Sequence, residues 1–191
     1  GCLYRRRAQY RESAPALDRV AARLMVGERG LNAVGAAVCF GALAYGIFWL
    51  QMRLDLEPCP LCILDRVAFS TAGVLFLLAA LHGPRGSGRR VYAGLTLIPL
   101  AFGLAVAGRH LWLQSLPAEQ VPACGGSLDY MLDNFPLGQV IDMVLRGSGS
   151  CADIQWQFLG LSIPAWTLLL FVVLTLIALV QLFRPVERRL F

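Results

Sequence analysis

Charged residues are scarce in this sequence. Only 15% of the residues are charged, lysine is absent, and all 17 basic residues are arginines. Apolar residues make up 57% of the chain and the mean hydropathy is +0.61, both above the values of an ordinary soluble domain. The scarcity of charge argues against a water-soluble protein and favours one that lies in a lipid bilayer.

Several cofactor motifs are missing as well. The chain has no C-x-x-C-H sequence for haem attachment, no cysteine set for an iron–sulfur cluster and no G-x-G-x-x-G fingerprint for a dinucleotide. The net charge of +5 is not accompanied by a nucleic-acid-binding motif. We therefore expect none of these cofactors and no nucleic-acid partner.

Long apolar runs, in contrast, are abundant. A membrane-spanning helix needs about 20 largely apolar residues, and four such segments occur, at about 31–50, 63–81, 91–114 and 163–183. Lipid offers no partners to backbone polar groups, so each segment must be helical. We predict an all-α membrane protein with a four-transmembrane-helix bundle over residues 31–183, an N-terminal tail at 1–30 and a C-terminal tail at 184–191.

The arginines indicate how the spans are oriented. Most precede the first span, lie between the second and third, or follow the fourth, whereas the other two loops are mainly acidic. The positive-inside rule predicts that both termini are cytoplasmic and that the loops at 51–62 and 115–162 face the periplasm of a bacterial inner membrane. The first apolar run is longer than that of a signal peptide, so we expect it to be retained.

The second periplasmic loop contains one helical pattern. Apolar residues share one helical face across 137–145, at Leu137, Val140, Ile141, Val144 and Leu145. This pattern predicts a short amphipathic helix. The helix can lie on the membrane surface or pack on the rest of the loop, and the sequence favours neither.

Four of the six cysteines fall on the predicted periplasmic side, an oxidising compartment: Cys59, Cys62, Cys124 and Cys151. A C-x-x-C motif can bind metal, act as a structural staple or act as a redox pair. Zinc is disfavoured because 26 residues separate Cys124 from Cys151, unlike the short second pair of such sites. We expect no metal site. A staple suits Cys124–Cys151, but the Cys59–Cys62 ring is too small to constrain much.

The redox interpretation has a physical basis. Cys59 and Cys62 stand where the first periplasmic loop becomes the second span, and a helix N-terminus stabilises thiolates. Arg66 follows Cys62 by one helical turn and adds positive charge on the same face. The loop pair lies between prolines and glycines, so it can reach a protein substrate. The fixed pair can reach a group in the membrane.

Oxidation of thiols releases two electrons, which need an acceptor. A membrane quinone is the natural acceptor at the lipid boundary, and its carbonyl oxygens need donors. Ionisable groups at membrane depth are candidates for this role. Arg66 and His110 are the residues we select, whereas Arg109 has the character of an anchor or counter-ion.

Three segments carry a resemblance to a known family. CPLCILDR at 59–66, GSCAD at 149–153 and FLGL at 158–161 resemble the bacterial disulfide bond formation protein B (DsbB) family. The resemblance implies a four-helix membrane bundle that reoxidises a DsbA-like periplasmic thiol oxidase and reduces ubiquinone or menaquinone. It also implies that the partner attacks Cys124, that Cys151 is the disulfide mate of Cys124, that Cys62 meets the quinone and that Arg66 and His110 support quinone binding.

Three alternatives accompany this assignment, and one of them is a zinc-binding membrane protein. A dedicated oxidase for another exported protein has the same cysteine layout. A non-enzymatic membrane protein with structural loop disulfides shares the topology and the compartment.

Overall fold

The computed structural model describes most of the chain outside the two tails and part of the second loop. The described residues are 27–56, 58–84, 86–120, 133–136, 138–140, 144 and 149–184. Cys2 and Cys124 lie outside these residues, so the structure does not place the proposed partner of Cys151.

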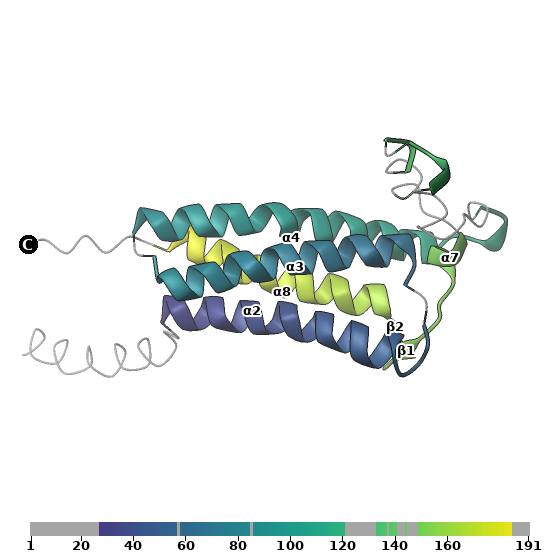
Figure 1. The fold of residues 1–191 in the computed structure, drawn as a ribbon, viewed down its shortest axis with the longest axis horizontal. Coiled ribbons are helices and arrows are strands. Elements are labelled where there is room, and N and C mark those ends of the chain that lie inside the picture. Colours follow the sequence, from purple (N-terminus) through teal and green to yellow (C-terminus); the bar gives the residue numbers. More distant parts are fainter. Residues whose placement is uncertain are drawn as a thin grey trace, which may run out of the picture.

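Four long helices form the molecule (Figure 1). They are α2 (Glu28–Ala44) with its π-helical continuation η1 (Tyr45–Gln51), α3 (Pro60–His82), α4 (Ser87–Gln114) and α8 (Ile163–Phe183). Each is long and apolar enough to span a membrane. The predicted four-helix membrane bundle is therefore confirmed.

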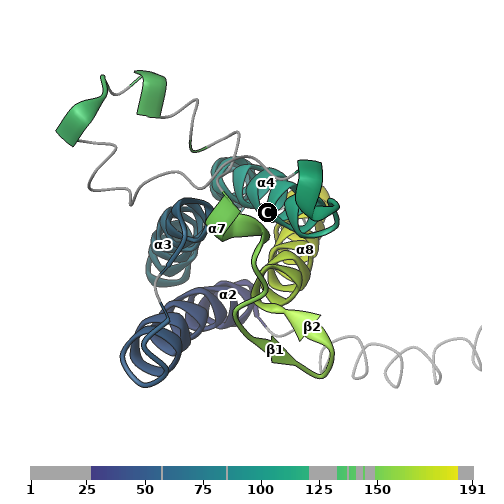
Figure 2. The same cartoon turned by 90° about the vertical axis from the view of Figure 1, so that its right-hand side faces the viewer.

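The helices are arranged in a ring in chain order, α2, α3, α4 and α8, when viewed from one end (Figure 2). α2 packs on α3, α3 on α4 and α4 on α8, whereas the contact between α2 and α8 that would close the ring is slight. This weak contact leaves room between α2 and α8.

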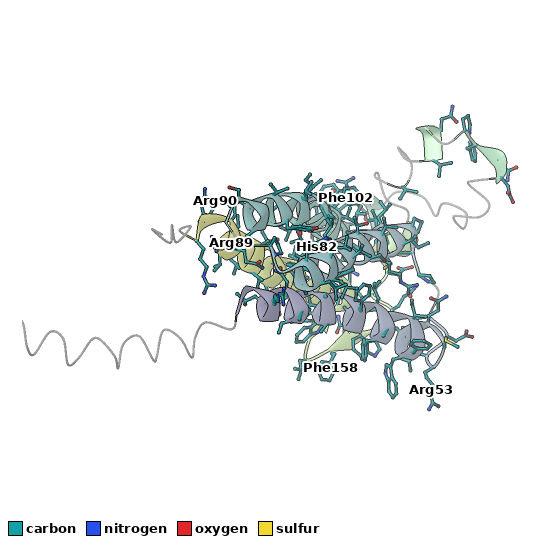
Figure 3. The ribbon with its side chains drawn as sticks, turned by 60° about the vertical axis from the view of Figure 1, so that its left-hand side comes forward. Arg53, His82, Arg89, Arg90, Phe102 and Phe158 are labelled. Atoms are coloured by element: carbon teal, nitrogen blue, oxygen red, sulfur yellow. The ribbon has the colours of Figure 1, made fainter. Side chains whose placement is uncertain are left out.

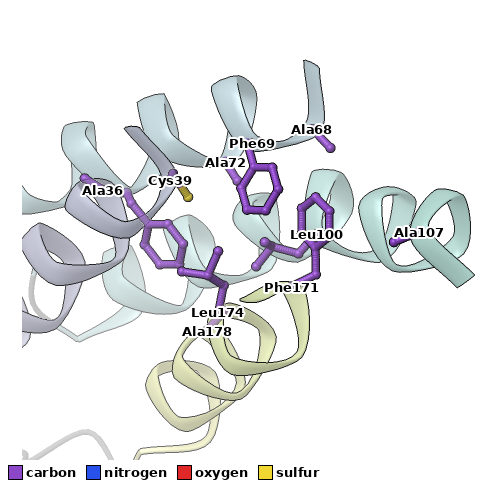
Figure 4. Packing of buried hydrophobic residues seen from close by; sticks show 11 residues of the cluster. Ala36, Cys39, Ala68, Phe69, Ala72, Leu100, Ala107, Phe171, Leu174 and Ala178 are labelled. Carbon is purple, nitrogen blue, oxygen red and sulfur yellow. The ribbon is translucent and has the colours of Figure 1, made fainter. Parts of the chain in front are cut away.

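The main core lies between the helices and uses small side chains to bring them together (Figure 4). The rings of Phe69 and Phe171 stack with centroids 4.1 Å apart. A Cβ atom on Gly103 would lie 2.4 Å from the Phe171 ring, so α4 can approach α8 only because this residue has no side chain. Cys39 is fully buried here and packs as a small apolar residue.

The short elements gather at one end of the bundle, beside the start of α3 (Figure 1). They are η2 (Ala118–Gln120), α7 (Gly149–Ala152) and the antiparallel strands β1 (Gln157–Phe158) and β2 (Leu161–Ser162). The hairpin turn has positive φ at Leu159 (53°) and Gly160 (77°), as a two-residue primed turn requires. The sequence gives no sign of this hairpin, because two-residue strands are too short to show an apolar periodicity.

The predicted amphipathic helix at 137–145 is described only at 138–140 and 144, all of them helical. Val140 and Val144 are buried, and Leu64 of α3 packs against them. At these two positions the apolar face therefore meets protein.

The surface and the ends of the bundle agree with a multi-pass membrane protein. Many large apolar side chains point outward along the helices, as a lipid environment allows. Arg89 and Arg90 lie at the end opposite Arg53 (Figure 3). Arg89 Nη2 donates a 2.5 Å hydrogen bond to the carbonyl of Arg184, which ties the start of α4 to the end of α8.

Candidate active site

The first turn of α3 is built from the C-x-x-C motif. Cys59 is the N-cap residue in an extended conformation, and its Sγ accepts a 3.4 Å hydrogen bond from the Cys62 backbone N–H. Pro60 occupies N1, where its fixed φ suits a helix start and its missing N–H costs no hydrogen bond. The helix therefore begins before the predicted span, and the two cysteines belong to its first turn.

The two sulfurs of the motif lie close together and differ in role. Cys59 Sγ donates a hydrogen bond to Cys62 Sγ over 2.9 Å. Cys59 is buried, whereas Cys62 is partly exposed. In this dithiol arrangement Cys62 is the acceptor.

Cys59 also belongs to a group that the sequence did not assemble. Cys59 Sγ lies 3.8 Å from Nε2 of His110, and the ligand atoms of Cys59, His110 and Cys151 are all within 4.8 Å of one another. We call these three residues the sulfur–imidazole cluster. They come from the start of α3, the C-terminal part of α4 and α7, whose separation in sequence hid the contact.

The surroundings of the sulfur–imidazole cluster are apolar. Leu61 and Leu113 are fully buried beside it, and Val106 is almost so. The Cys151 thiol hydrogen-bonds to Cys59 and lowers its pKa. The hydrogen bond to Cys62, burial and the Cys62 charge outweigh this effect and raise the pKa of Cys59 to about 12. Cys59 is therefore held as a neutral thiol.

A cavity of about 650 Å³ opens on the other side of this helix turn. Its walls come mainly from α2, η1, α3 and α8, at the place where α2 and α8 make little contact. The residues of this wall that carry polar groups or large rings include Cys62, Asp65, Arg66, His110, Trp156 and Trp166. The structure thus brings Cys62, Arg66 and His110, which were selected from the sequence, to one cavity.

Arg66 is oriented by the end of the first span. Its Nη1 donates a 2.8 Å hydrogen bond to Gln51 Oε1, and its Nη2 lies 3.5 Å from the carbonyl oxygen of Gly46. Both partners belong to η1, a π-helical segment of the kind often found at functional sites. Gln51 was not selected from the sequence, because it lies in another helix and no motif contains it.

Asp65 and Thr167 form a polar contact inside the bundle. Thr167 Oγ1 of α8 donates a long, 3.5 Å hydrogen bond to Asp65 Oδ2. Asp65 is buried, and among the described residues its Oδ1 has no hydrogen-bond partner. The carboxyl group thus leaves an acceptor beside the cavity that an entering hydroxyl group can satisfy.

Arg109 is directed elsewhere. Its guanidinium carbon lies 4.2 Å from the ring centroid of Trp112, one turn later on α4. Arg109 is not part of the described cavity wall, whereas the adjacent His110 is. Of these two basic residues near the end of α4, only His110 belongs to the described cavity wall.

Comparison with known proteins gives a specific match. The family described as disulfide bond formation protein DsbB matches residues 28–181 of the chain. Disulfide bond formation protein B from Nitrosococcus oceani is 55% identical over 136 residues, which are 71% of this chain and 80% of the relative. The protein of the same name from Marinobacter nauticus is 54% identical over 152 residues, 80% of this chain and 90% of the relative. The family match includes all four helices and every residue of the sulfur–imidazole cluster.

Proposed function

The chain is a membrane protein of the DsbB family of disulfide bond formation proteins, and we propose that it is a thiol:quinone oxidoreductase. It reoxidises a DsbA-like periplasmic thiol oxidase and passes the two electrons to ubiquinone or menaquinone. The observation that carries this proposal is the shared cavity of Cys62, Arg66 and His110. In this cavity the proposed redox sulfur of Cys62, the guanidinium of Arg66 and the imidazole of His110 surround one space at the lipid boundary.

The residues around the cavity fit a quinone. Its volume of about 650 Å³ is in the range of small-molecule sites, and tryptophan and phenylalanine side chains suit an aromatic ring. A bound quinone supplies a two-electron, two-proton acceptor. The Arg66 guanidinium has five N–H donors, and its contacts with Gln51 and Gly46 leave donors for a carbonyl oxygen. Asp65 Oδ1 offers an acceptor on the same wall.

The sulfur–imidazole cluster supports a route for the electrons. Once the partner has reduced the loop pair, the Cys151 thiolate attacks Cys59 of a Cys59–Cys62 disulfide. A Cys151–Cys59 bond forms, the Cys59–Cys62 bond breaks, and Cys62 leaves as a thiolate at the cavity. The contact between Cys151 and Cys59 supports this order of attack. Cys124 lies outside the described residues, and its role rests on the family resemblance.

His110 reaches both parts of the proposed site. Its Nε2 is 3.8 Å from Cys59 Sγ, and it also belongs to the cavity wall. An imidazole in this place can take up the proton that Cys59 loses when it forms a disulfide. We assign His110 this proton-transfer role.

The decisive experiment is anaerobic mixing of a reduced DsbA-like partner, the purified protein and quinone, with quinone reduction followed by absorbance. The Cys62→Ser variant is expected to lose quinone reduction, because its hydroxyl cannot donate electrons. Cys39→Ala is the matched control, since Cys39 is buried in the core away from the cavity, and it is expected to keep turnover. Wild-type turnover by Cys62→Ser would contradict the proposed mechanism.

We also propose that the cysteine end of the bundle faces the periplasm. The support is the position of Arg89 and Arg90 at the opposite end, as the positive-inside rule requires of a cytoplasmic face. A membrane-impermeant thiol reagent applied to reduced spheroplasts is expected to label Cys62. Labelling of Cys62 only after the membrane has been permeabilised would reverse the orientation.

A further inference from the structure

We propose that the reduced protein binds one Zn²⁺ ion between Cys59, His110 and Cys151, and that this ion inhibits the oxidase. Binding itself does not depend on the proposed function. Only its inhibitory consequence rests on that function. The wide spacing of Cys124 and Cys151 disfavours a zinc site made of the four cysteines alone. The structure replaces the distant Cys124 with His110 and thereby offers a different ligand set.

The geometry of the sulfur–imidazole cluster is close to that of a zinc site. Zinc binds sulfur at about 2.3 Å and histidine nitrogen at about 2.0–2.1 Å in a tetrahedron, so neighbouring ligand atoms are roughly 3.5–3.8 Å apart. Cys59 Sγ and His110 Nε2 are already 3.8 Å apart. All three ligand atoms lie within 4.8 Å of one another, so shifts of about 1 Å complete the triangle.

A fourth ligand is available beside the triangle. Cys62 Sγ lies 2.9 Å from Cys59 Sγ. Both cysteines and His110 line a second, small cavity of about 30 Å³. A single water needs only about 10–15 Å³, so this space holds one ion or one water. A water in this cavity can therefore complete a four-coordinate site.

Apolar packing holds the three ligands in place. The three ligands are buried, and they belong to three different elements that pack on one another through apolar side chains such as Leu61 and Leu113. Two thiolates and a neutral imidazole bring the site with Zn²⁺ to zero net charge. Burial of this neutral assembly avoids the large penalty of an isolated buried charge.

The donor atoms select the class of metal. Thiolate sulfur and imidazole nitrogen suit zinc, whereas Mg²⁺ and Ca²⁺ require oxygen ligands. On binding, two S–H bonds break, two Zn–S bonds and one Zn–N bond form, and two protons leave to solvent. No electron moves, so the site needs no oxidant or reductant.

The same sulfurs cannot serve zinc and a disulfide at once. A disulfide sulfur has no thiolate charge to donate, so Zn²⁺ selects the reduced protein and stabilises it by mass action. Zinc also occupies Cys59, the sulfur that exchanges with Cys151 in the proposed electron route. The ion should therefore stop turnover by trapping the reduced state.

Binding is tested with purified full-length protein and Zn²⁺ alone, in competition with a chromogenic zinc indicator. The protein is reduced anaerobically and freed of reductant. A sample of the same protein oxidised at both cysteine pairs is measured for comparison. We expect one Zn²⁺ per reduced chain and none in the oxidised sample. Mg²⁺ in large excess should not displace it. Absence of zinc binding by the reduced protein would overturn the proposal.

Four variants locate the ion. Cys151→Ser and His110→Ala are expected to weaken zinc binding by more than the roughly 10–100-fold that loss of an outer-shell partner costs. Cys124→Ser and Cys39→Ala are expected to bind zinc as the wild type does. Wild-type affinity in both of the first two variants, or loss of binding in Cys124→Ser, places the ion elsewhere and overturns the assignment.

A separate activity measurement distinguishes this inference from the proposed function. Zinc at a saturating concentration is expected to stop quinone reduction, and a chelator is expected to restore it. Unchanged turnover by the zinc-loaded protein overturns the inhibitory role. Zinc binding by a protein that shows no turnover even without metal contradicts the proposed function and leaves the metal site standing.

Discussion

At the end of the bundle that carries the cysteines, the side of α4 and the side of α2 differ in how closely they pack. On the α4 side, buried leucines surround Cys59, and the bare backbone of Gly103 lets the Phe171 ring of α8 approach closely. On the α2 side, α2 and α8 make little contact, and the 650 Å³ cavity lies between them. A Cβ on Gly41, which lines this cavity, would meet nothing within 4 Å.

This difference shows how one short motif can perform two tasks. Cys59 and Cys62 are three residues apart, yet Cys59 meets the closely packed side and Cys62 meets the cavity. The packed side fixes sulfurs for exchange with each other. The cavity side is where the proposed function places the quinone. The following predictions test this division, beginning with the largest expected effect.

The largest difference is expected between the alkylation rates of Cys59 and Cys62. With a pKa of about 12, Cys59 has about a thousandfold less thiolate near neutral pH than a thiol of pKa 9.0. Since only the thiolate reacts, the alkylation rate of Cys59 should keep rising above pH 9, through the window between these two pKa values. Mass spectrometry of the reduced protein measures both sites. A Cys59 rate that levels off near pH 9 would contradict the assigned neutral thiol.

The packing contrast predicts unequal effects of the same mutation. Gly103→Ala places a methyl group 2.4 Å from the Phe171 ring and should destabilise the bundle by roughly 1–3 kcal/mol. The methyl group added by Gly41→Ala has no neighbouring atom within 4 Å, so this variant should leave the thermal unfolding midpoint unchanged or slightly raised. Gly94→Ala, on α4 and also without contacts, is the matched control. Equal midpoints for the Gly103 and Gly94 variants would show that α4 and α8 do not pack as described.

The smallest effects are expected from mutation of Arg66 and of Gln51, the residue that orients the Arg66 guanidinium. Arg66→Ala should raise the apparent KM for quinone about tenfold, since a charged hydrogen bond contributes about 1.5–3 kcal/mol. Gln51→Ala should raise it about threefold, because Arg66 keeps its charge but loses its 2.8 Å partner. Arg53→Ala removes an exposed arginine that is not part of the described cavity wall and serves as the control. An unchanged quinone dependence in Arg66→Ala would remove Arg66 from the site.

Sequence by itself determined the features that depend on neighbouring residues. The four spans follow from apolar runs, because lipid forces a largely apolar segment of about 20 residues to be helical. The placement of Cys59 and Cys62 at a helix start, with Arg66 one turn later, follows from local spacing in the same way. These features need no knowledge of which helices touch.

Only the tertiary structure decided which distant groups meet. The contact of Cys59 with His110 and Cys151 joins residues 51 or more positions apart. The hydrogen bond from Arg66 to Gln51 and the contact of Thr167 with the buried Asp65 also join different helices. A continuous apolar run predicts that a helix lies in lipid, but helix order and rotation depend on side-chain packing, such as that of Phe171 on Gly103. For this reason the sequence identified the redox motif, while the cavity and the sulfur–imidazole cluster became visible only in the folded bundle.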